Sequence, residues 1–343
     1  MEPLTVIVSA AGAPGTAALL AALRANGERE IRLVGTDMNP RAVGAHLCDS
    51  FHLVPPGSDP DFAPAVAEIA RREGAHAVVP QSSFDLEALA TAIDLFPDTA
   101  VLVSPRGAID ACNDKAATYE LLHHLGLPAP AFRRVRGADA VHAAALELGY
   151  PAQPVCFKPV FSSGSRGFRV LDPTVDRVHQ LLEERPGAVA MRLEEAVELL
   201  AGAPEVELLV MELARGTERT IDGIANGREV VLGHPKTREA MRAGLAMFFV
   251  TLDDPGLMAL ADTLVGALGI EHFFNIQLVG EMVSEINPRI STIVYQDDLN
   301  LPYLGIKRAL GEISDPELGA LRGRVRPGRS ALRYFSQLEF DVV

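Results

Sequence analysis

Short apolar runs alternate with segments of helical periodicity over the first 110 residues of the chain. The strand candidates are residues 4–9, 31–35, 51–54, 77–80 and 101–104, and the helix candidates are residues 16–25 and 62–72. Turn residues separate the two kinds of segment. This alternation predicts a doubly wound α/β domain with a parallel sheet over residues 1–111.

The pattern changes after Cys112 to strands mixed with helices, which predicts α+β packing. Asn113 and Asp114 open a helix that ends near Leu125. The further strand candidates are residues 155–159, 168–171, 208–213, 219–225, 229–232, 273–279 and 282–286, and the further helix candidates are residues 138–149, 192–200 and 255–268. We therefore expect two further domains, at residues 112–210 and 211–343.

Composition narrows the class of protein. The 343 residues are enough for two or three domains, and no apolar run approaches the length of a membrane span. The first residues lack the features of a signal peptide, so we expect a cytoplasmic protein with no membrane partner. A net charge of −14 argues against a nucleic-acid partner, and we interpret the arginines in residues 322–333 as a solvated loop before a last strand.

The three cysteines, Cys48, Cys112 and Cys156, are odd in number and far apart in the sequence. They therefore suit neither a disulfide framework nor a metal clip, and we expect reduced thiols in the core.

One group of polar residues lies close to the C-terminal end, at Gln277 and in the run 284–289. Residues two apart on a strand share a face, so Glu285 and Asn287 are expected side by side, with Arg289 just beyond. Carboxylate and amide oxygens are ligands that magnesium prefers, and a guanidinium suits a phosphoryl or carboxylate oxygen. The alternative is an edge hairpin whose Glu and Asn are simply solvated.

A second group is Lys158, at the end of a strand, followed by the Gly/Ser-rich loop 162–167. Such a loop can close its amides over phosphate oxygens while the ammonium neutralises them. The alternative is a flexible hairpin with a solvated lysine. The loop lacks the Gly-Lys-Ser/Thr ending of a P-loop.

Other candidates are ordinary when taken singly. Lys115 follows Asp114 at a helix start, where Asp114 suits an N-cap, and Glu212 and Glu218 read as charges near strand ends. His234 is more often a turn residue than a catalyst. The turn at residues 12–15 lacks the spacing of a dinucleotide fingerprint, and Asp37 suits a turn cap.

Two acidic residues of the leading domain, Asp85 and Glu87, follow a strand near the edge where ligands gather in such sheets. They could bind an amine. Two exposed carboxylates at a helix start are the plainer interpretation.

The order of these groups resembles the ATP-grasp superfamily, and within it the carbamoyl-phosphate-synthetase-like branch of carboxylate-amine ligases. The similarity runs from the leading sheet to a closing strand at residues 333–335, and residues 285–289 are the most specific match. It implies an ATP-grasp fold with an N-terminal Rossmann-like (pre-ATP-grasp) domain over residues 1–111. Residues 112–210 would form the small lid subdomain, and residues 211–343 the large subdomain with the metal site.

The resemblance also implies roles for single residues. Lys115 and Lys158 would hold the nucleotide phosphates, and Arg289 would steady the transferring phosphoryl group. The lid over the γ-phosphate would include Ser163, Gly164, Ser165 and Gly167; the adenine would meet Glu212 and the backbone of Leu213; the ribose would meet Glu218. Gln277, Glu285 and Asn287 would carry two magnesium ions, with manganese as a substitute, and His234 and Arg238 would contact substrate.

The implied reaction is ATP-dependent joining of a small carboxylate to an amine or similar nucleophile through an acyl phosphate, giving ADP and phosphate. Two alternatives stay open: another phosphoryl-transfer enzyme of this fold, such as a bicarbonate-activating or kinase-like one, and a non-catalytic nucleotide-binding subunit. The sequence does not identify the acid, the amine or the oligomeric state, for which a homodimer is a base-rate expectation.

Overall fold

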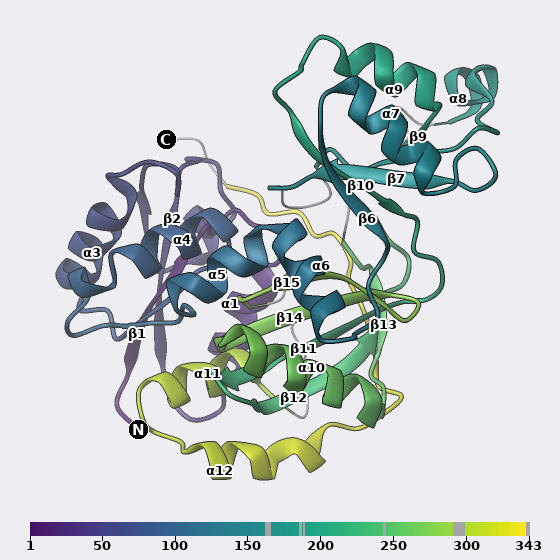
Figure 1. Ribbon diagram of the computed structural model, residues 1–343. Coiled ribbons are helices and arrows are strands. Elements are labelled where there is room, and N and C mark those ends of the chain that lie inside the picture. Colours follow the sequence, from purple (N-terminus) through teal and green to yellow (C-terminus); the bar gives the residue numbers. More distant parts are fainter. Residues whose placement is uncertain (162–165, 185–186, 188, 243–244, 291–298, 341–343) are drawn as a thin grey trace. The chain divides into compact units, whose positions relative to one another are not determined.

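The computed structural model describes residues 1–161, 166–184, 187, 189–242, 245–290 and 299–340 (Figure 1). The chain forms two compact units. The first comprises Met1–Ala108, Thr217–Ile276 and Asn287–Val343, and the second comprises Ile109–Gly216 and Gln277–Ile286. One hydrophobic core cluster lies wholly in the first unit and another wholly in the second.

A parallel sheet with strand order β3-β2-β1-β4-β5 opens the first unit (Figure 1). Its strands are β1 Leu4–Ser9, β2 Ile31–Asp37, β3 Ser50–Leu53, β4 Ala77–Val79 and β5 Ala100–Val101. Its helices are α1 Thr16–Arg24, α2 Gly44–Leu47, α3 Phe62–Glu73 and α4 Ser83–Thr91. The predicted doubly wound domain is confirmed, because the Val, Ile and Leu runs bury both faces of the central strands.

The turn after β1 is closed by Asp37. Its Oδ2 accepts a hydrogen bond from the Gly12 amide at 2.7 Å, and its Oδ1 accepts one from the Asn39 amide at 2.8 Å. A Cβ on Gly12 would lie 3.0 Å from that carboxylate, so a side chain there would crowd the turn. Asp37 is thus the turn cap that the sequence predicts.

The second unit is built on a mixed sheet with strand order β6-β10-β7-β8-β9. Its strands are β6 Phe132–Arg136, β7 Val155–Pro159, β8 Arg169–Leu171, β9 Ala190–Met191 and β10 Glu207–Glu212. Helices α7 Ala138–Glu147 and α9 Leu193–Leu200 cover one face and share a core with β7 and β10, and α8 Arg177–Glu183 lies near them (Figure 1). The hairpin β7–β8 is confirmed, whereas β6 and β9 were not predicted.

Two helices lead into this sheet, α5 Arg106–Asn113 and α6 Lys115–His124. Asp114 separates them and caps α6, accepting hydrogen bonds from the Ala116 and Ala117 amides at 2.9 and 3.0 Å. The predicted N-cap is confirmed, and it fixes Lys115 as the first residue of the helix.

A further sheet has the strand order β12-β11-β14-β15. Its strands are β11 Glu218–Asn226, β12 Val230–Thr237, β14 Glu271–Val279 and β15 Met282–Asn287. The prediction that β12 ends at Leu232 is wrong, because the strand continues through Pro235. An edge strand tolerates proline, and β12 is at the edge of the sheet as ordered here.

Helix α10 Pro255–Leu268 has the predicted bounds, with Asp254 as N-cap and Gly269 at φ 68° after its end. Helices α11 Leu301–Ala309 and α12 Asp315–Gly319 follow later in the chain. The closing strand predicted at residues 333–335 is wrong. Strand β16 Ser330–Leu332 pairs instead with β13 Phe248–Val250, and beyond this ladder the Arg333 amide still donates to the Met247 carbonyl at 2.7 Å.

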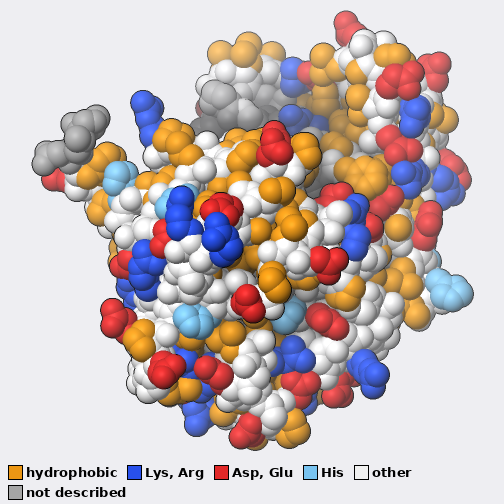
Figure 2. Space-filling view, turned by 90° about the vertical axis from the view of Figure 1, so that its left-hand side faces the viewer, with side chains coloured by type: hydrophobic (Ala, Val, Ile, Leu, Met, Phe, Trp, Pro, Cys, Tyr) orange, Lys and Arg blue, Asp and Glu red, His pale blue; other side chains and the backbone are white. Residues whose placement is uncertain are grey.

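On the face drawn in Figure 2, Lys and Arg side chains are interspersed with Asp and Glu side chains. Arg322 is exposed, as expected, and its guanidinium also donates to the Val230 and Val231 carbonyls of β12 at 2.5 and 3.1 Å. Among the described residues, no helix is long and apolar enough to cross a bilayer.

The three cysteines are free thiols, with Cys112 and Cys156 buried and Cys48 half-buried. Burial raises the pKa of Cys48 to about 11 and the pKa values of Cys112 and Cys156 to about 12. The expectation of core thiols therefore holds for Cys112 and Cys156 and in part for Cys48.

Candidate active site

Lys158 is held in place by two other elements of the second unit. Its Nζ donates to the Tyr119 hydroxyl of α6 at 2.8 Å and to the Ser284 carbonyl of β15 at 3.2 Å. The Tyr119 hydroxyl itself donates to that carbonyl at 2.8 Å, and Nζ lies 5.0 Å from the centre of the Tyr119 ring. The ammonium is therefore fixed by hydrogen bonds and a cation–π contact.

A narrow pocket, too small in this structure to admit a water molecule, lies beside this lysine in the same unit. Its lining residues are Cys112, Lys115, Thr118, Tyr119, Ser284, Glu285 and Ile286. Lys115 and Tyr119 are four residues apart on α6 and so share a helix face. The structure thus brings together the predicted residues Lys115, Lys158 and Glu285.

The electrostatics of this pocket favour an anionic ligand. Burial lowers the pKa of Lys158 to about 8, with the charge of Lys115 adding to that effect and Glu285 opposing it. Burial also lowers the pKa of Lys115, against the charges of Glu285 and Asp114. Two ammonium groups that lose hydration and are offset mainly by one carboxylate gain free energy when phosphate oxygens approach.

The loop after β7 is described only in part. Ser163, Gly164 and Ser165 lie outside the described residues, whereas Gly167 has φ 75°. A Cβ on Gly167 would lie 2.6 Å from Pro159 Cγ, so the chain here returns against the end of β7 in a way that glycine permits.

Glu212 and Leu213 lie at the end of β10 and are half-buried. The Glu212 amide donates to the Ala131 carbonyl at 2.9 Å, and its carboxylate accepts from the Ala131 amide at 3.4 Å. Gln277 is half-buried on β14, and its carbonyl accepts from the Ser284 hydroxyl at 3.1 Å. Gln277 therefore lies next to the strand that carries Glu285.

Asn287 and Arg289 belong to the first unit. Asn287 is buried at the end of β15, and its Oδ1 faces Arg289 Nη2 at 3.5 Å. The other guanidinium nitrogen, Nη1, donates to the Ile290 carbonyl at 3.1 Å. The two predicted residues are thus neighbours in space as well as in sequence.

Two other predicted residues of the first unit form an ion pair with each other. Arg238 Nη1 lies 3.2 Å from Glu218 Oε2, which joins the two ends of the β11–β12 hairpin. Any ligand hydroxyl that bound Glu218 would therefore meet a carboxylate already oriented by a guanidinium.

The expectation that His234 is a turn residue is wrong. It lies within β12 and is buried, and burial together with the charge of Lys236 lowers its pKa to about 3, so the ring is neutral at physiological pH. Lys236, next to it, is fully buried and pairs with Asp222 at 2.7 Å. A contact between His234 and substrate stays a prediction.

Asp85 also departs from expectation. It is 5% exposed and not a surface carboxylate, because it packs at the start of α4 and accepts from the Ser9 hydroxyl at 2.6 Å. Burial raises its pKa to about 6. Glu87 does lie at the surface, where it pairs with Arg106 at 2.8 Å.

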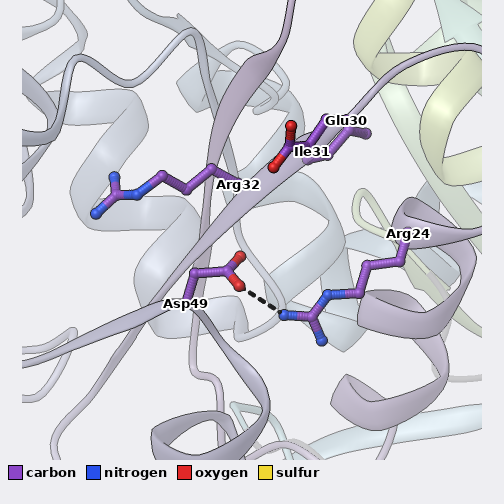
Figure 3. Close-up of a pocket in the computed structure, with 5 residues that line it drawn as sticks. All are labelled: Arg24, Glu30, Ile31, Arg32 and Asp49. Atoms are coloured by element: carbon purple, nitrogen blue, oxygen red, sulfur yellow. Dashed lines mark hydrogen bonds and ion pairs between the residues drawn. The ribbon is translucent and has the colours of Figure 1, made fainter.

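A wider concavity of about 390 Å³ lies in the first unit, away from these residues (Figure 3). It is lined by Arg24, Glu30, Ile31, Arg32 and Asp49. Arg24 pairs with Asp49 at 3.1 Å, and Arg32 pairs with Glu73 at 2.7 Å. Its charges are therefore largely neutralised within the protein, and it contains none of the predicted site residues.

Sequence reasoning missed several residues of this arrangement, namely Tyr119, Asp222 and Asn275. A signal existed for Tyr119, which is four residues after Lys115 on a predicted helix. Neither Asp222 nor Asn275 stands out in the sequence, since each is one of several polar residues in its strand.

The donor atoms suit a hard divalent cation. Gln277, Glu285 and Asn287 offer one carboxylate and two amide oxygens, which is the type of ligand set that magnesium takes together with phosphates and waters. Within the described ranges, no group of three or more His, Cys, Asp or Glu side chains could hold a metal ion. A site in these residues would therefore depend on amide oxygens.

Comparisons with known proteins agree on the fold. Residues 204–326 match a family model described as ATP-grasp in the biosynthetic pathway with Ter operon. The structure resembles the biotin carboxylase domain of Hydrogenobacter thermophilus 2-oxoglutarate carboxylase, with a TM-score of 0.65 at 17% identity over 95% of this chain and 73% of that one. The chain therefore has the ATP-grasp fold, and its residues 204–326 resemble an ATP-grasp family.

Two other known proteins are similar over different lengths. L-amino acid ligase from Bacillus licheniformis has a TM-score of 0.62 at 16% identity, covering 96% of this chain and 78% of that one. The carbamoyl phosphate synthase large chain of Mycobacterium sp. (strain JLS) is 30% identical over 204 residues, which are 56% of this chain. The match spans 17% of the length of that relative.

Proposed function

We propose that the chain is an ATP-dependent ligase that activates a small carboxylate as an acyl phosphate and passes the acyl group to an amine. The observation that carries this proposal is the grouping of three charged residues from separate elements of the second unit. Lys115 and Glu285 line the pocket, and Lys158 interacts electrostatically with both. The names of its relatives support it, since they include a carbamoyl phosphate synthase and an L-amino acid ligase.

The residue roles follow the chemistry of each side chain. Lys115 and Lys158 would bind phosphate oxygens, Glu212 and the Leu213 backbone the adenine, and Glu218 the ribose. Gln277, Glu285 and Asn287 would hold magnesium, which when bound neutralises charge on the phosphates. The loop with Ser163 to Gly167 would cover the γ-phosphate, and residues 1–111, 112–210 and 211–343 would act as leading domain, lid and large subdomain.

In the first step a substrate carboxylate oxygen would attack the γ-phosphorus, and the bond from that phosphorus to the β,γ-bridging oxygen would break to release ADP. Arg289 and Lys158 would stabilise the charge on the transferring group by position and electrostatics. In the second step the amine nitrogen would attack the acyl carbon, releasing phosphate and losing a proton. Exclusion of water by a closed loop would protect the acyl phosphate from hydrolysis.

A trapping experiment tests this reaction. The purified chain is incubated with ATP, magnesium and a matrix of carboxylates and amines, and ADP release is measured, with hydroxylamine added to parallel samples. We expect a hydroxamate from the active carboxylate, because hydroxylamine captures an acyl phosphate. ADP release with every active acid but no hydroxamate would contradict the proposed intermediate.

Bicarbonate activation is a second candidate, favoured by the bicarbonate in the described complex of the Hydrogenobacter neighbour and by the carbamoyl phosphate synthase relatives. It predicts ADP release that depends on bicarbonate and on no other acid. Absence of magnesium-dependent ATP turnover with every substrate would instead support a nucleotide-binding subunit. A homodimer is proposed by analogy with the dimer named for that neighbour, and a cytoplasmic location stays an expectation from the sequence.

The pKa of Lys158 predicts how nucleotide affinity depends on pH. With a pKa of about 8 instead of the usual 10.5, the amine is charged below pH 8 and loses its proton above it. Affinity for metal-free ADP should therefore be steady up to about pH 7.5 and fall by up to about tenfold per unit above pH 8, where binding must take up a proton.

Calorimetric titration of ADP in EDTA from pH 6.5 to 9.5 measures this effect. A Lys158→Met variant should bind weakly with a flatter profile. Lys307→Met is the matched control, because Lys307 also lies over a tyrosine ring, at 5.5 Å from the centre of Tyr303, but pairs with Glu28 in the first unit. A wild-type profile in Lys158→Met would contradict the assignment.

A further inference from the structure

A line of buried polar side chains crosses the sheet β12-β11-β14-β15, with one member on each strand. In that order they are Lys236, Asp222, Asn275 and Asn287, and all four belong to the first unit. Their exposed fractions are 0%, 1%, 4% and 6%. Buried polar groups are costly unless they are hydrogen-bonded, so the geometry of this line is strongly constrained.

On one side of the two asparagines lies Asp222, which here acts only as an acceptor. Its Oδ2 lies 2.7 Å from Lys236 Nζ, a group that can only donate. Its Oδ1 lies 2.9 Å from the Asn275 amide, so the atom of Asn275 at that position must be nitrogen.

Thr220 gives the same orientation independently. Its hydroxyl donates to the Ile276 carbonyl at 3.1 Å, so its oxygen can only accept from Asn275 Nδ2 at 2.5 Å. With Nδ2 directed to Asp222 and Thr220, Asn275 turns its oxygen toward Asn287. That oxygen lies 3.4 Å from Asn287 Nδ2.

On the other side of the two asparagines lies Arg289, whose guanidinium can only donate hydrogen bonds. Its Nη2 lies 3.5 Å from the Asn287 amide, so the atom facing it must be oxygen. The two ends therefore require the same orientation of both amides, although the last two contacts are long for hydrogen bonds.

We infer that Asp222 and Asn275 are positioning residues, which hold the Asn287 amide so that its Oδ1 is presented on the side of Arg289. This inference rests on the proposed function, in which Asn287 Oδ1 is a ligand of magnesium. An amide NH₂ cannot ligate a cation. An unrestrained asparagine can turn either its amide oxygen or its amide nitrogen toward the ion. Hydrogen bonds that orient a ligand commonly change metal affinity by about 10- to 100-fold.

The test is the effect of magnesium on ADP binding to an Asn275→Leu variant. We expect its affinity for ADP in EDTA to match the wild type, because the residues proposed for phosphate and adenine are unchanged. The magnesium concentration that gives half of the metal-dependent gain in ADP affinity should rise about 10- to 100-fold. Calorimetric titrations of ADP at a series of MgCl₂ concentrations measure both quantities.

Three further variants make the result specific. Asn275→Ser keeps a polar group but is too short to bridge Asp222 and Asn287. Its half-effective magnesium concentration should rise as well, and it replaces Asn275→Leu in the test if that variant fails to fold. Thr251→Val removes another buried hydrogen bond of the first unit, from its hydroxyl to the Arg326 carbonyl at 2.6 Å, and should keep the wild-type response. Asn287→Ala should lose most of it.

The outcomes separate the two proposals. If Asn287→Ala loses the response to magnesium while the folded Asn275 variants keep it, the positioning role is wrong and the metal role of Asn287 stands. If Asn287→Ala responds as the wild type does, the metal role is wrong and the inference falls with it. An equal shift in Thr251→Val and Asn275→Leu would assign the effect to lost stability and overturn the positioning role.

Discussion

An Arg289→Ala variant is expected to bind ATP about as well as the wild type and to lose about 1000-fold in the rate of ADP formation. The guanidinium is held by the Ile290 carbonyl and by Asn287 Oδ1, two contacts that fix its plane without neutralising its charge. Such a group contributes most when charge spreads over the transferring phosphoryl oxygens, so kcat should fall and the Kd for nucleotide should not.

Arg289→Lys should recover only part of the rate, because an ammonium lacks the planar fork. Arg308→Ala is the matched control, since Arg308 is also a half-buried arginine of the first unit but is bound to Asp315 at 2.6 Å. Single-turnover measurements with the active acid separate binding from chemistry. Undiminished turnover in Arg289→Ala would remove this residue from the reaction.

A Lys236→Met variant is expected to lower the free energy of unfolding by about 3–5 kcal/mol. The Lys236 and Asp222 side chains are 0% and 2% exposed, and Nζ also lies 4.9 Å from the centre of the Phe249 ring. Removing the lysine leaves a buried carboxylate with neither water nor a counter-charge, and such an uncompensated charge is strongly destabilising.

Urea denaturation measures the change. Lys307→Met removes a lysine from an ion pair whose Glu28 side chain is 43% exposed, and it should cost less than about 1 kcal/mol. Adding Asp222→Asn to Lys236→Met should restore part of the loss by removing the stranded charge. A loss of under 1 kcal/mol in the single variant would show that the pair does not carry the stability assigned to it.

Much of the fold follows from local sequence signals. The strands β1 and β7 and the helix α10 have the predicted bounds, because branched apolar runs, Asp254-Pro255 at a helix start and Gly269 at its end each act within a few residues. The grouping of Lys115, Lys158 and Glu285 was predicted from a resemblance of order along the chain, and local rules alone do not supply it.

The features that escaped prediction depend on contacts between distant segments. Asp85 is three residues after the N-cap of its helix, a position that usually faces water, and packing against Ser9 buries it. Residues 233–237 read as a loop because of Gly233 and Pro235, yet pairing of Thr220 with Lys236 extends the strand. The same register puts Lys236 diagonal to Asp222, which no single sequence discloses.

The protonated state of the three thiols has a practical consequence. Alkylating reagents attack the thiolate, and pKa values of about 11 to 12 leave almost none at neutral pH. The native thiols should therefore react only slowly with maleimides. A cysteine introduced at an exposed position such as Leu181 of α8 would take up a fluorophore or spin label selectively, and changes in the environment of that label could then be followed as nucleotide binds.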